Sequence, residues 1–196
     1  MVMDLNKWLG ILLLAVPPLA NAEVMITPML GYTVGGSVKD NNGNKYDMQA
    51  SESYAIAIET PVEKGRIGLF YSQQNTQLET LGFGSPIKYL HIQSSLDLPI
   101  NERFITYVGI GLGGSYVDVS WAENKYGFSA SGFAGLEYKI TNHISINGQL
   151  RWLGTVVDSN SSTQCYYTQD TQNCRIQFDS DWMNQFQSNI GMTFRF

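Results

Sequence analysis

The last eleven residues, Phe186–Phe196, read F-Q-S-N-I-G-M-T-F-R-F and decide the fold. Every second residue is mostly apolar, and those between are polar or glycine; the first set is Phe186, Ser188, Ile190, Met192, Phe194 and Phe196. Strict alternation is the period of a β-strand that lies between two unlike environments. A strand of about 9–11 residues with one apolar side is what a tilted membrane-spanning strand requires. The stretch therefore predicts a barrel strand with apolar side chains toward lipid and polar side chains inside.

The same alternation recurs along the chain and predicts seven further strands. These are Val24–Gly35, Ser53–Thr60, Arg66–Gln74, Tyr89–Leu98, Phe104–Gly113, Phe128–Ile140 and Ile144–Trp152. The connections alternate between long and short, and in outer-membrane barrels the short turns face the periplasm. Aromatic residues near strand ends predict two membrane-interface girdles: Tyr32, Tyr54, Phe128 and Trp152 at the loop side, Phe104, Tyr138 and Phe196 at the turn side.

The expected fold class is therefore all-β: an eight-stranded antiparallel transmembrane β-barrel with short periplasmic turns and long extracellular loops. A soluble β-sandwich is the alternative, but it does not explain why the connection lengths alternate.

Composition excludes several classes of protein. The net charge of −5 disfavours a nucleic-acid partner, which requires a basic surface. Charged residues make up 15% of the chain, below the ~25% of ordinary soluble domains. The mean hydropathy of −0.13 is too low for a helical membrane protein. Few charges and a neutral average hydropathy fit alternating strands in a membrane.

The N-terminus predicts export. Lys7 precedes the largely apolar stretch Trp8–Leu19, and Ala20-Asn21-Ala22 reads as an A-x-A cleavage site. Pro17-Pro18 argues against a retained anchor helix. We expect residues 1–22 to be a signal peptide and residues 23–196 to form the barrel, in the cell outer membrane.

With these features in place, the chain resembles the small outer-membrane barrels of Gram-negative bacteria, of the OmpA transmembrane-domain, OmpX and OmpW types. Ile26–Tyr32 and Leu153–Ser159 with the later cysteine pair are similar to the "outer membrane beta-barrel" proteins. The resemblance covers nearly all of the mature chain but implies no shared catalytic set. It implies that Phe194 and Phe196 form the C-terminal signal that the barrel-assembly machinery reads. It also implies outer-membrane lipid and lipopolysaccharide as surroundings.

Cys165 and Cys174 are the chain's two cysteines, and both fall in the last predicted loop. In an oxidising compartment an isolated pair predicts a disulfide. Closing a loop of about ten residues would contribute ~2–3 kcal/mol in the chain-entropy model. A metal site or a redox pair would need flanking histidines or a C-x-x-C spacing, which the sequence lacks here.

Six ionisable residues at inward positions lie close to the short turns: Glu59, Arg66, Asp97, Glu137, Lys139 and Arg195. A buried charge is costly unless it is paired, so mixed signs at one level predict a lumen charge network. Glycines, serine, tyrosine and Arg151 face the upper lumen, which we expect to be more hollow. The interior of an eight-stranded barrel holds its own side chains or one small ligand.

Three motifs suggest chemistry, and the sequence argues against each. Gly109–Gly114 has the letters of a dinucleotide loop, but no helix opening follows it; the glycines at 109, 111 and 113 instead leave room in the lumen. Asp40–Asn44 suggests a calcium loop, but its glycine is at the wrong position and the twelfth residue is Ser51. His143 and Ser145 have the spacing of a base and its nucleophile on one strand face, but at the periplasmic rim. We expect no cofactor, no metal and no catalytic residue.

The expected function is therefore a non-enzymatic structural and interaction role through the extracellular loops. Those loops carry residues suited to recognition of a host or surface ligand: Tyr116, Trp121, Tyr166 and Tyr167. One alternative is a narrow pore or carrier for small solutes, as the OmpW resemblance implies. Another is a lipid-modifying outer-membrane enzyme.

Overall fold

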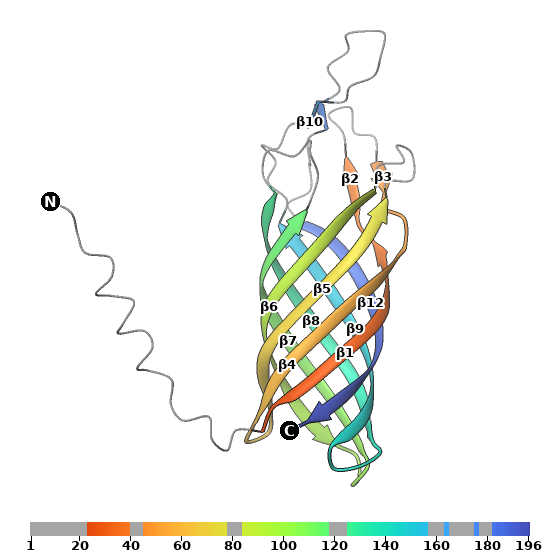
Figure 1. The fold of residues 1–196 in the computed structure, drawn as a ribbon. Helices are drawn as coiled ribbons and strands as arrows, with labels where there is room; N and C mark the ends of the chain where they lie inside the picture. Colours follow the sequence, from red (N-terminus) through yellow and green to blue (C-terminus); the bar gives the residue numbers. More distant parts are fainter. Residues whose placement is uncertain are drawn as a thin grey trace, which may run out of the picture.

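The protein is described by a computed structural model that covers residues 23–39, 45–77, 84–117, 125–156, 163–164, 175–176 and 182–196. In this part of the chain eight long strands close into one barrel (Figure 1). They are β1 (Met25–Gly35), β4 (Ser51–Val62), β5 (Gly65–Gln77), β6 (Gly84–Pro99), β7 (Phe104–Val117), β8 (Tyr126–Lys139), β9 (Ile144–Val156) and β12 (Trp182–Arg195). Each pairs antiparallel with its two neighbours, which confirms the predicted fold class. Among the described residues, no helix is long and apolar enough to cross a membrane.

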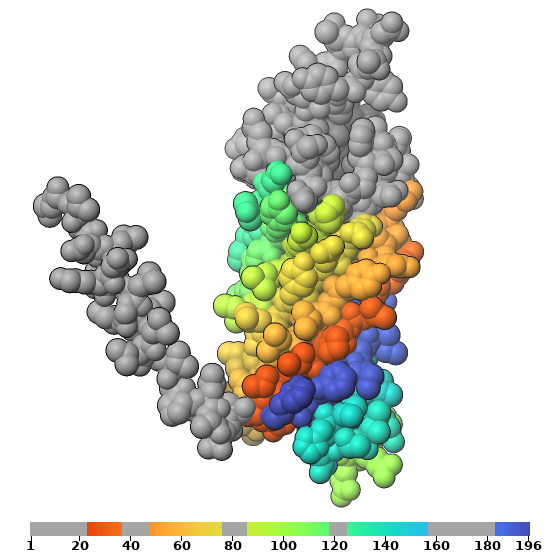
Figure 2. Space-filling model, viewed as in Figure 1, coloured from red at the N-terminus to blue at the C-terminus, as the bar shows by residue number. Residues whose placement is uncertain are grey.

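The barrel closes between its first and last strands, which lie side by side on the face shown in Figure 2. Leu30 of β1 pairs with Ile190 of β12. At the periplasmic end the Val24 amide donates to the Phe196 carbonyl at 3.2 Å, and the Phe196 amide donates to Val24 at 3.0 Å. Closure leaves no unpaired strand edge, and a β-structure in lipid requires this because no water is present to satisfy its backbone.

The two faces of the wall differ as the alternation predicts. Outward side chains form an exposed apolar belt around the barrel; Leu30 is 61% exposed, Ile110 65%, Leu150 69% and Ile190 64%. Inward positions are buried and largely polar. A soluble protein rarely exposes an apolar surface of this extent, so the belt is the surface that contacts lipid.

Side chains hold the periplasmic turns. Val62 pairs with Gly65 across the turn between β4 and β5. Between β6 and β7, Asn101 Oδ1 accepts from the amides of Arg103 and Phe104, both at 2.9 Å. Between β8 and β9, Thr141 Oγ1 accepts from the amides of His143 and Ile144, at 3.2 and 3.0 Å. Short polar side chains that bond the nearby backbone in this way are typical of tight turns.

The strands extend further at the extracellular end than the sequence predicts. β5 continues to Gln77 and β7 to Val117, and two predicted loops contain short hairpins. These are β2 (Ser37–Lys39) with β3 (Lys45–Asp47), and β10 (Thr163–Gln164) with β11 (Arg175–Ile176). Alternation ends where lipid contact ends, whereas backbone pairing continues, so a pattern such as Gln73-Gln74-Asn75-Thr76-Gln77 gives no strand signal.

Candidate functional site

The lumen near the periplasmic end contains ion pairs that cross the barrel. Arg66 on β5 donates from Nε to Asp97 Oδ1 on β6 at 3.0 Å. Its Nη1 lies 2.8 Å from Glu137 Oε2 on β8, and Glu137 is fully buried. β5 and β8 are not neighbours in the barrel, so this pair spans the interior.

Glu137 also binds a second arginine. Arg195 on β12 donates from Nη2 to Glu137 Oε1, and its Nη1 donates to Ser145 Oγ at 2.6 Å. Two guanidinium groups and the carboxylates of Asp97 and Glu137 thus compensate one another. Burial of charge is tolerated only with such pairing, and losing one partner leaves the others uncompensated.

The other two residues of the predicted network lie differently. Glu59 Oε1 accepts from Gln93 Nε2 at 2.8 Å rather than from an arginine. Gln93 in turn accepts through Oε1 from Arg151 Nη2 at 2.6 Å, so this amide connects Glu59 to Arg151. Lys139 is half-buried and makes no ion pair with another residue of the described strands and turns.

Arg151 occupies the middle of the lumen, and the sequence analysis gave it no role. Its guanidinium carbon lies 3.6 Å from the ring centroid of Phe70 and 4.1 Å from that of Phe133. It also donates to Ser131 Oγ at 2.8 Å and to Gln149 Oε1 at 3.2 Å. A desolvated cation between two aromatic faces is held by cation–π attraction as well as by its hydrogen bonds. The sequence did contain a sign of this role, because Arg151 is an inward cation in the middle of a predicted strand, far from the charges near the turns.

Glycines make room for the lumen rings, as predicted. A Cβ on Gly111 would lie 2.7 Å from Ser131 Oγ and 3.3 Å from His91 Cβ, and one on Gly109 would contact the Phe133 ring. Gly135 stands against the Tyr107 ring in the same way. The small residues of β7 and β8 therefore set where the bulky lumen side chains lie.

Histidine and serine meet in the lumen, but not where the sequence suggested. His91 is buried, with Nε2 2.7 Å from Ser129 Oγ and Nδ1 3.1 Å from Ser131 Oγ. His143 is exposed because it lies in the turn before β9 begins, whereas Ser145 is buried and bonds Arg195. The spacing that suggested a catalytic pair thus does not place the two on one strand face.

The upper lumen is filled, and the expectation of a hollow there is wrong at this level. Ile87, Tyr89, Leu153 and Met183 form one buried apolar cluster. Tyr89 donates through its hydroxyl to Gln185 Oε1 at 2.7 Å. Ile87, Leu153 and Met183 lie just beyond the ends of the predicted strands, where the alternation gave no signal.

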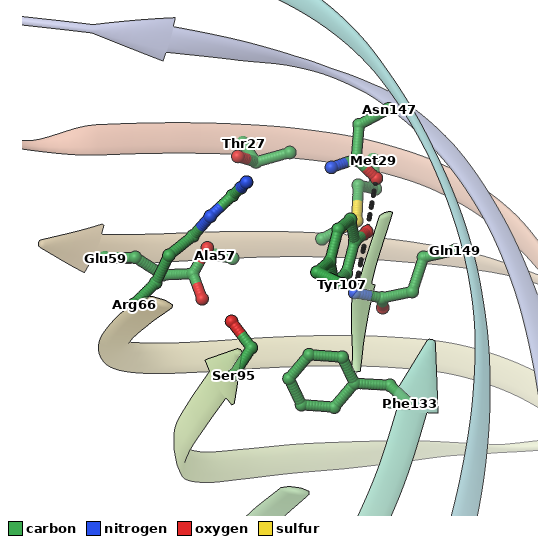
Figure 3. Close-up of a pocket in the computed structure, with 10 residues that line it drawn as sticks. All are labelled: Thr27, Met29, Ala57, Glu59, Arg66, Ser95, Tyr107, Phe133, Asn147 and Gln149. Carbon is green, nitrogen blue, oxygen red and sulfur yellow. Dashed lines mark hydrogen bonds between the residues drawn. The ribbon is translucent and has the colours of Figure 1, made fainter. Parts of the chain in front are cut away.

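A cavity of about 10 Å³ lies between the charged layer and Arg151's neighbours (Figure 3). Glu59, Arg66, Ser95, Tyr107 and Asn147 contribute to its lining. Tyr107 donates to Asn147 Oδ1 at 2.7 Å across one side of it. The volume is about that of one water molecule, so the cavity does not form a passage.

Cys165 and Cys174 lie outside the described residues, and their disulfide stays a prediction. The described pair Gln164↔Arg175 joins β10 to β11, and in the sequence each of these residues is next to one of the cysteines. We expect mature protein from oxidising medium to resist thiol alkylation until a reductant is added, and to weigh two hydrogens less than the reduced form by mass spectrometry. Alkylation of both thiols in the unfolded, unreduced protein would contradict it. Cys165→Ser controls for incomplete alkylation.

The C-terminal aromatics occupy the outer face of the last strand. Phe194 pairs with Ile26, and Phe196 is 74% exposed beyond the end of β12. Both face lipid, where assembly factors in the membrane would meet them. Their role as an assembly signal stays a prediction.

Comparison with known proteins identifies the fold. No protein-family model matches the sequence, and no curated protein matches it. Among solved structures, Neisserial surface protein A is 11% identical, covers 88% of this chain and 97% of its own, and has a TM-score of 0.59. Outer membrane protein H from P. aeruginosa is 18% identical, with 89% and 100% covered and a TM-score of 0.53. Ail, the attachment invasion locus protein of Yersinia pestis, is 14% identical, with 90% and 99% covered and a TM-score of 0.52.

These structures are small outer-membrane barrels, and at such identities the similarity establishes the fold alone. It agrees with the closed eight-stranded topology and with the apolar belt, which requires a membrane. The chain is a small eight-stranded β-barrel of the outer-membrane class, located in the outer membrane.

Proposed function

We propose that the protein is a closed, non-enzymatic barrel that acts through its extracellular end and not through its lumen. The observation that carries this proposal is the ion pair Arg66–Glu137, which joins the non-neighbouring strands β5 and β8 across the interior, with Arg195 on the same carboxylate. Above it the Phe70–Arg151–Phe133 stack crosses the interior a second time. A solute on the barrel axis would have to displace both layers.

A narrow pore, the alternative from sequence, gains no support from this geometry. Opening one would separate buried opposite charges, which costs several kcal/mol per ion unless new partners replace them. The other alternative, a lipid-modifying enzyme, gains no support from the geometry either. The His91–Ser129–Ser131 group is enclosed within the lumen, away from any lipid.

We expect the refolded mature protein to show no steady ion conductance in planar lipid bilayers. The physical reason is that the described lumen retains a cavity for about one water molecule and not a continuous aqueous path. A general porin inserted in the same bilayers shows that the assay detects a channel. Reproducible ohmic steps from the barrel, at a protein purity that excludes porin contamination, would overturn the closed-lumen proposal.

The extracellular role has a separate test. The barrel wall and the periplasmic turns would remain if residues 157–181 were replaced by a short glycine-serine linker. We expect the shortened protein to reach the outer membrane and to migrate as a heat-modifiable barrel, while cells that carry it lose attachment to surfaces or host cells relative to cells with the full chain. Equal attachment by the two strains, and by a strain without the protein, would contradict a role of this segment in attachment.

A further inference from the structure

The outer wall of the barrel has a groove at the extracellular end that the lumen-based proposal does not use. It has a volume of about 480 Å³ and lies over β6, β7 and β8, with Tyr71 of β5 at one side. Its outward lining consists of Tyr71, Lys88, Leu90, Gly114, Tyr116 and Tyr126. Binding sites for small molecules typically have ~300–1,000 Å³ and mostly apolar walls, and this groove has both properties.

The groove exists because one outward position lacks a side chain. Gly114 pairs with Leu90 on one side and with Phe128 on the other, and both neighbours are more than half exposed. A Cβ on Gly114 would meet only the Gly127 carbonyl oxygen, at 3.5 Å. The wall is therefore hollow at Gly114, between side chains that project into the lipid.

The position of the groove limits what can fill it. The Tyr116↔Tyr126 pair ends the β7–β8 ladder, and the two rings are 5.1 Å apart. Tyrosines at the end of an apolar belt mark the membrane interface, here that of the outer leaflet. The part of the groove below them, at Leu90 and Gly114, faces hydrocarbon, so its surroundings fit an acyl chain.

The charge at the rim selects among lipids. Lys88 Nζ lies 5.7 Å from the Tyr116 ring centroid, which holds the ammonium at the interface. Within the described chain the lining contains no acidic residue, although the protein as a whole carries a net charge of −5. A cation next to a hydrocarbon groove complements a lipid with an anionic headgroup.

From these observations we infer that the groove binds a phosphorylated glycolipid of the outer leaflet. One acyl chain lies over Gly114 between Leu90 and Tyr126, and a phosphate of the headgroup accepts from Lys88. The tyrosine rings pack against the sugar at the interface, as amphipathic rings do. This site is on the outside of the barrel and does not depend on whether the lumen conducts.

The test uses native mass spectrometry on the mature barrel, reconstituted in nanodiscs of zwitterionic phospholipid with a minor fraction of lipid A. We expect the wild type to retain lipid A in preference to phospholipid. Lys88→Gln should reduce retention about fivefold, the equivalent of the ~1 kcal/mol that one cation contributes near an anionic surface. Gly114→Leu should reduce retention to the level of phospholipid because it fills the groove.

Two controls make the result specific. Gly148 is also outward, and a Cβ there would meet nothing within 4 Å, so Gly148→Leu adds the same side chain to another part of the wall and should retain lipid A normally. Lipid A without its phosphates should bind wild type and Lys88→Gln equally. If Gly114→Leu does not fold, the comparison of Lys88→Gln with the wild type still decides the question. Lys88 lies outside the lumen, so its replacement leaves the lumen contacts unchanged.

Three outcomes would overturn the inference. The first is equal retention of lipid A and phospholipid by the wild type. The second is a Lys88→Gln protein that retains phosphorylated lipid A as well as the wild type does. The third is a mass corresponding to two copies of the chain that Gly114→Leu abolishes, which would make the groove a contact between barrels.

Discussion

Replacing Glu137 with Gln is expected to lower the free energy of unfolding by about 3–5 kcal/mol, the usual cost of breaking a buried ion pair from one side. Glu137 is fully buried and is the carboxylate that Arg66 and Arg195 share. Glutamine keeps the shape and one acceptor oxygen but removes the negative charge. Arg195 keeps Ser145 and the Glu23 carboxylate at 3.9 Å, and Arg66 keeps Asp97, yet both cations lose the fully buried carboxylate that they share.

Urea unfolding of the refolded protein in lipid vesicles, followed by tryptophan fluorescence, measures the effect. Lys139→Gln is the matched control, because Lys139 lies on the same strand two positions away and has no ion pair with a described residue. We expect the control to change stability by less than about 0.5 kcal/mol. Equal losses for the two variants would mean that the ion pairs across the lumen do not stabilise the barrel.

A double variant tests whether the charged residues of the lumen act as one network. Arg66→Met in the Glu137→Gln background removes one of the two cations that lost the Glu137 carboxylate, and Arg195 keeps Ser145 and Glu23. We expect the double variant to be more stable than the sum of the two single losses predicts, by about 0.5–3 kcal/mol, because the residues form one network. Simple additivity would show that they act independently.

The wall of the barrel could be predicted from the sequence because lipid and lumen impose opposite demands on alternate residues. Phe186, Ile190 and Met192 carry this signal in β12, and the structure exposes all three. The periplasmic turns could also be predicted, since Asn101 and Thr141 are short polar residues between two alternating segments. The upper strand ends were not, because both of their faces lie outside the hydrocarbon and lose the alternation.

The arrangement of the lumen side chains could be predicted only in part. Inward direction follows from alternation, so Arg66, Asp97, Glu137 and Arg195 could be placed at one level. Which partner each residue contacts depends on the stagger between strands that are not neighbours. This stagger cannot be predicted from a single sequence. Glu59 therefore meets Gln93 rather than Arg66. His91 meets the two serines of β8 for the same reason, although no local spacing links them.

The groove at Gly114 was missed because the sequence analysis assigned the glycines at 109, 111 and 113 to the lumen and gave the next one no role. An outward glycine has no polarity that would mark it. The hollow at Gly114 can be recognised only when Leu90 and Phe128 are known to be its cross-strand neighbours. The signal in the sequence was the cluster of tyrosines and one lysine at the ends of the adjacent strands.

Replacing Arg151 with Met is expected to cost about 3 kcal/mol in free energy of unfolding. A desolvated cation–π contact contributes up to ~2 kcal/mol, and Arg151 has two aromatic partners. A hydrogen bond from a charged group contributes ~1.5–3 kcal/mol, and the change also leaves Gln93 Oε1 without its donor. Met retains most of the apolar volume between the rings, which limits the loss from packing.

Arg151→Lys tests whether the planar guanidinium matters, or only its charge. Lysine keeps the cation but does not lie flat between Phe70 and Phe133 while donating to Ser131 and Gln93, so we expect a loss of about 2 kcal/mol, close to that of Met. Arg103→Met, in an exposed periplasmic turn, should change stability by less than about 0.5 kcal/mol in the same urea titrations. A Lys variant as stable as the wild type would show that charge alone, compensated by Glu59 through Gln93, holds the middle of the lumen.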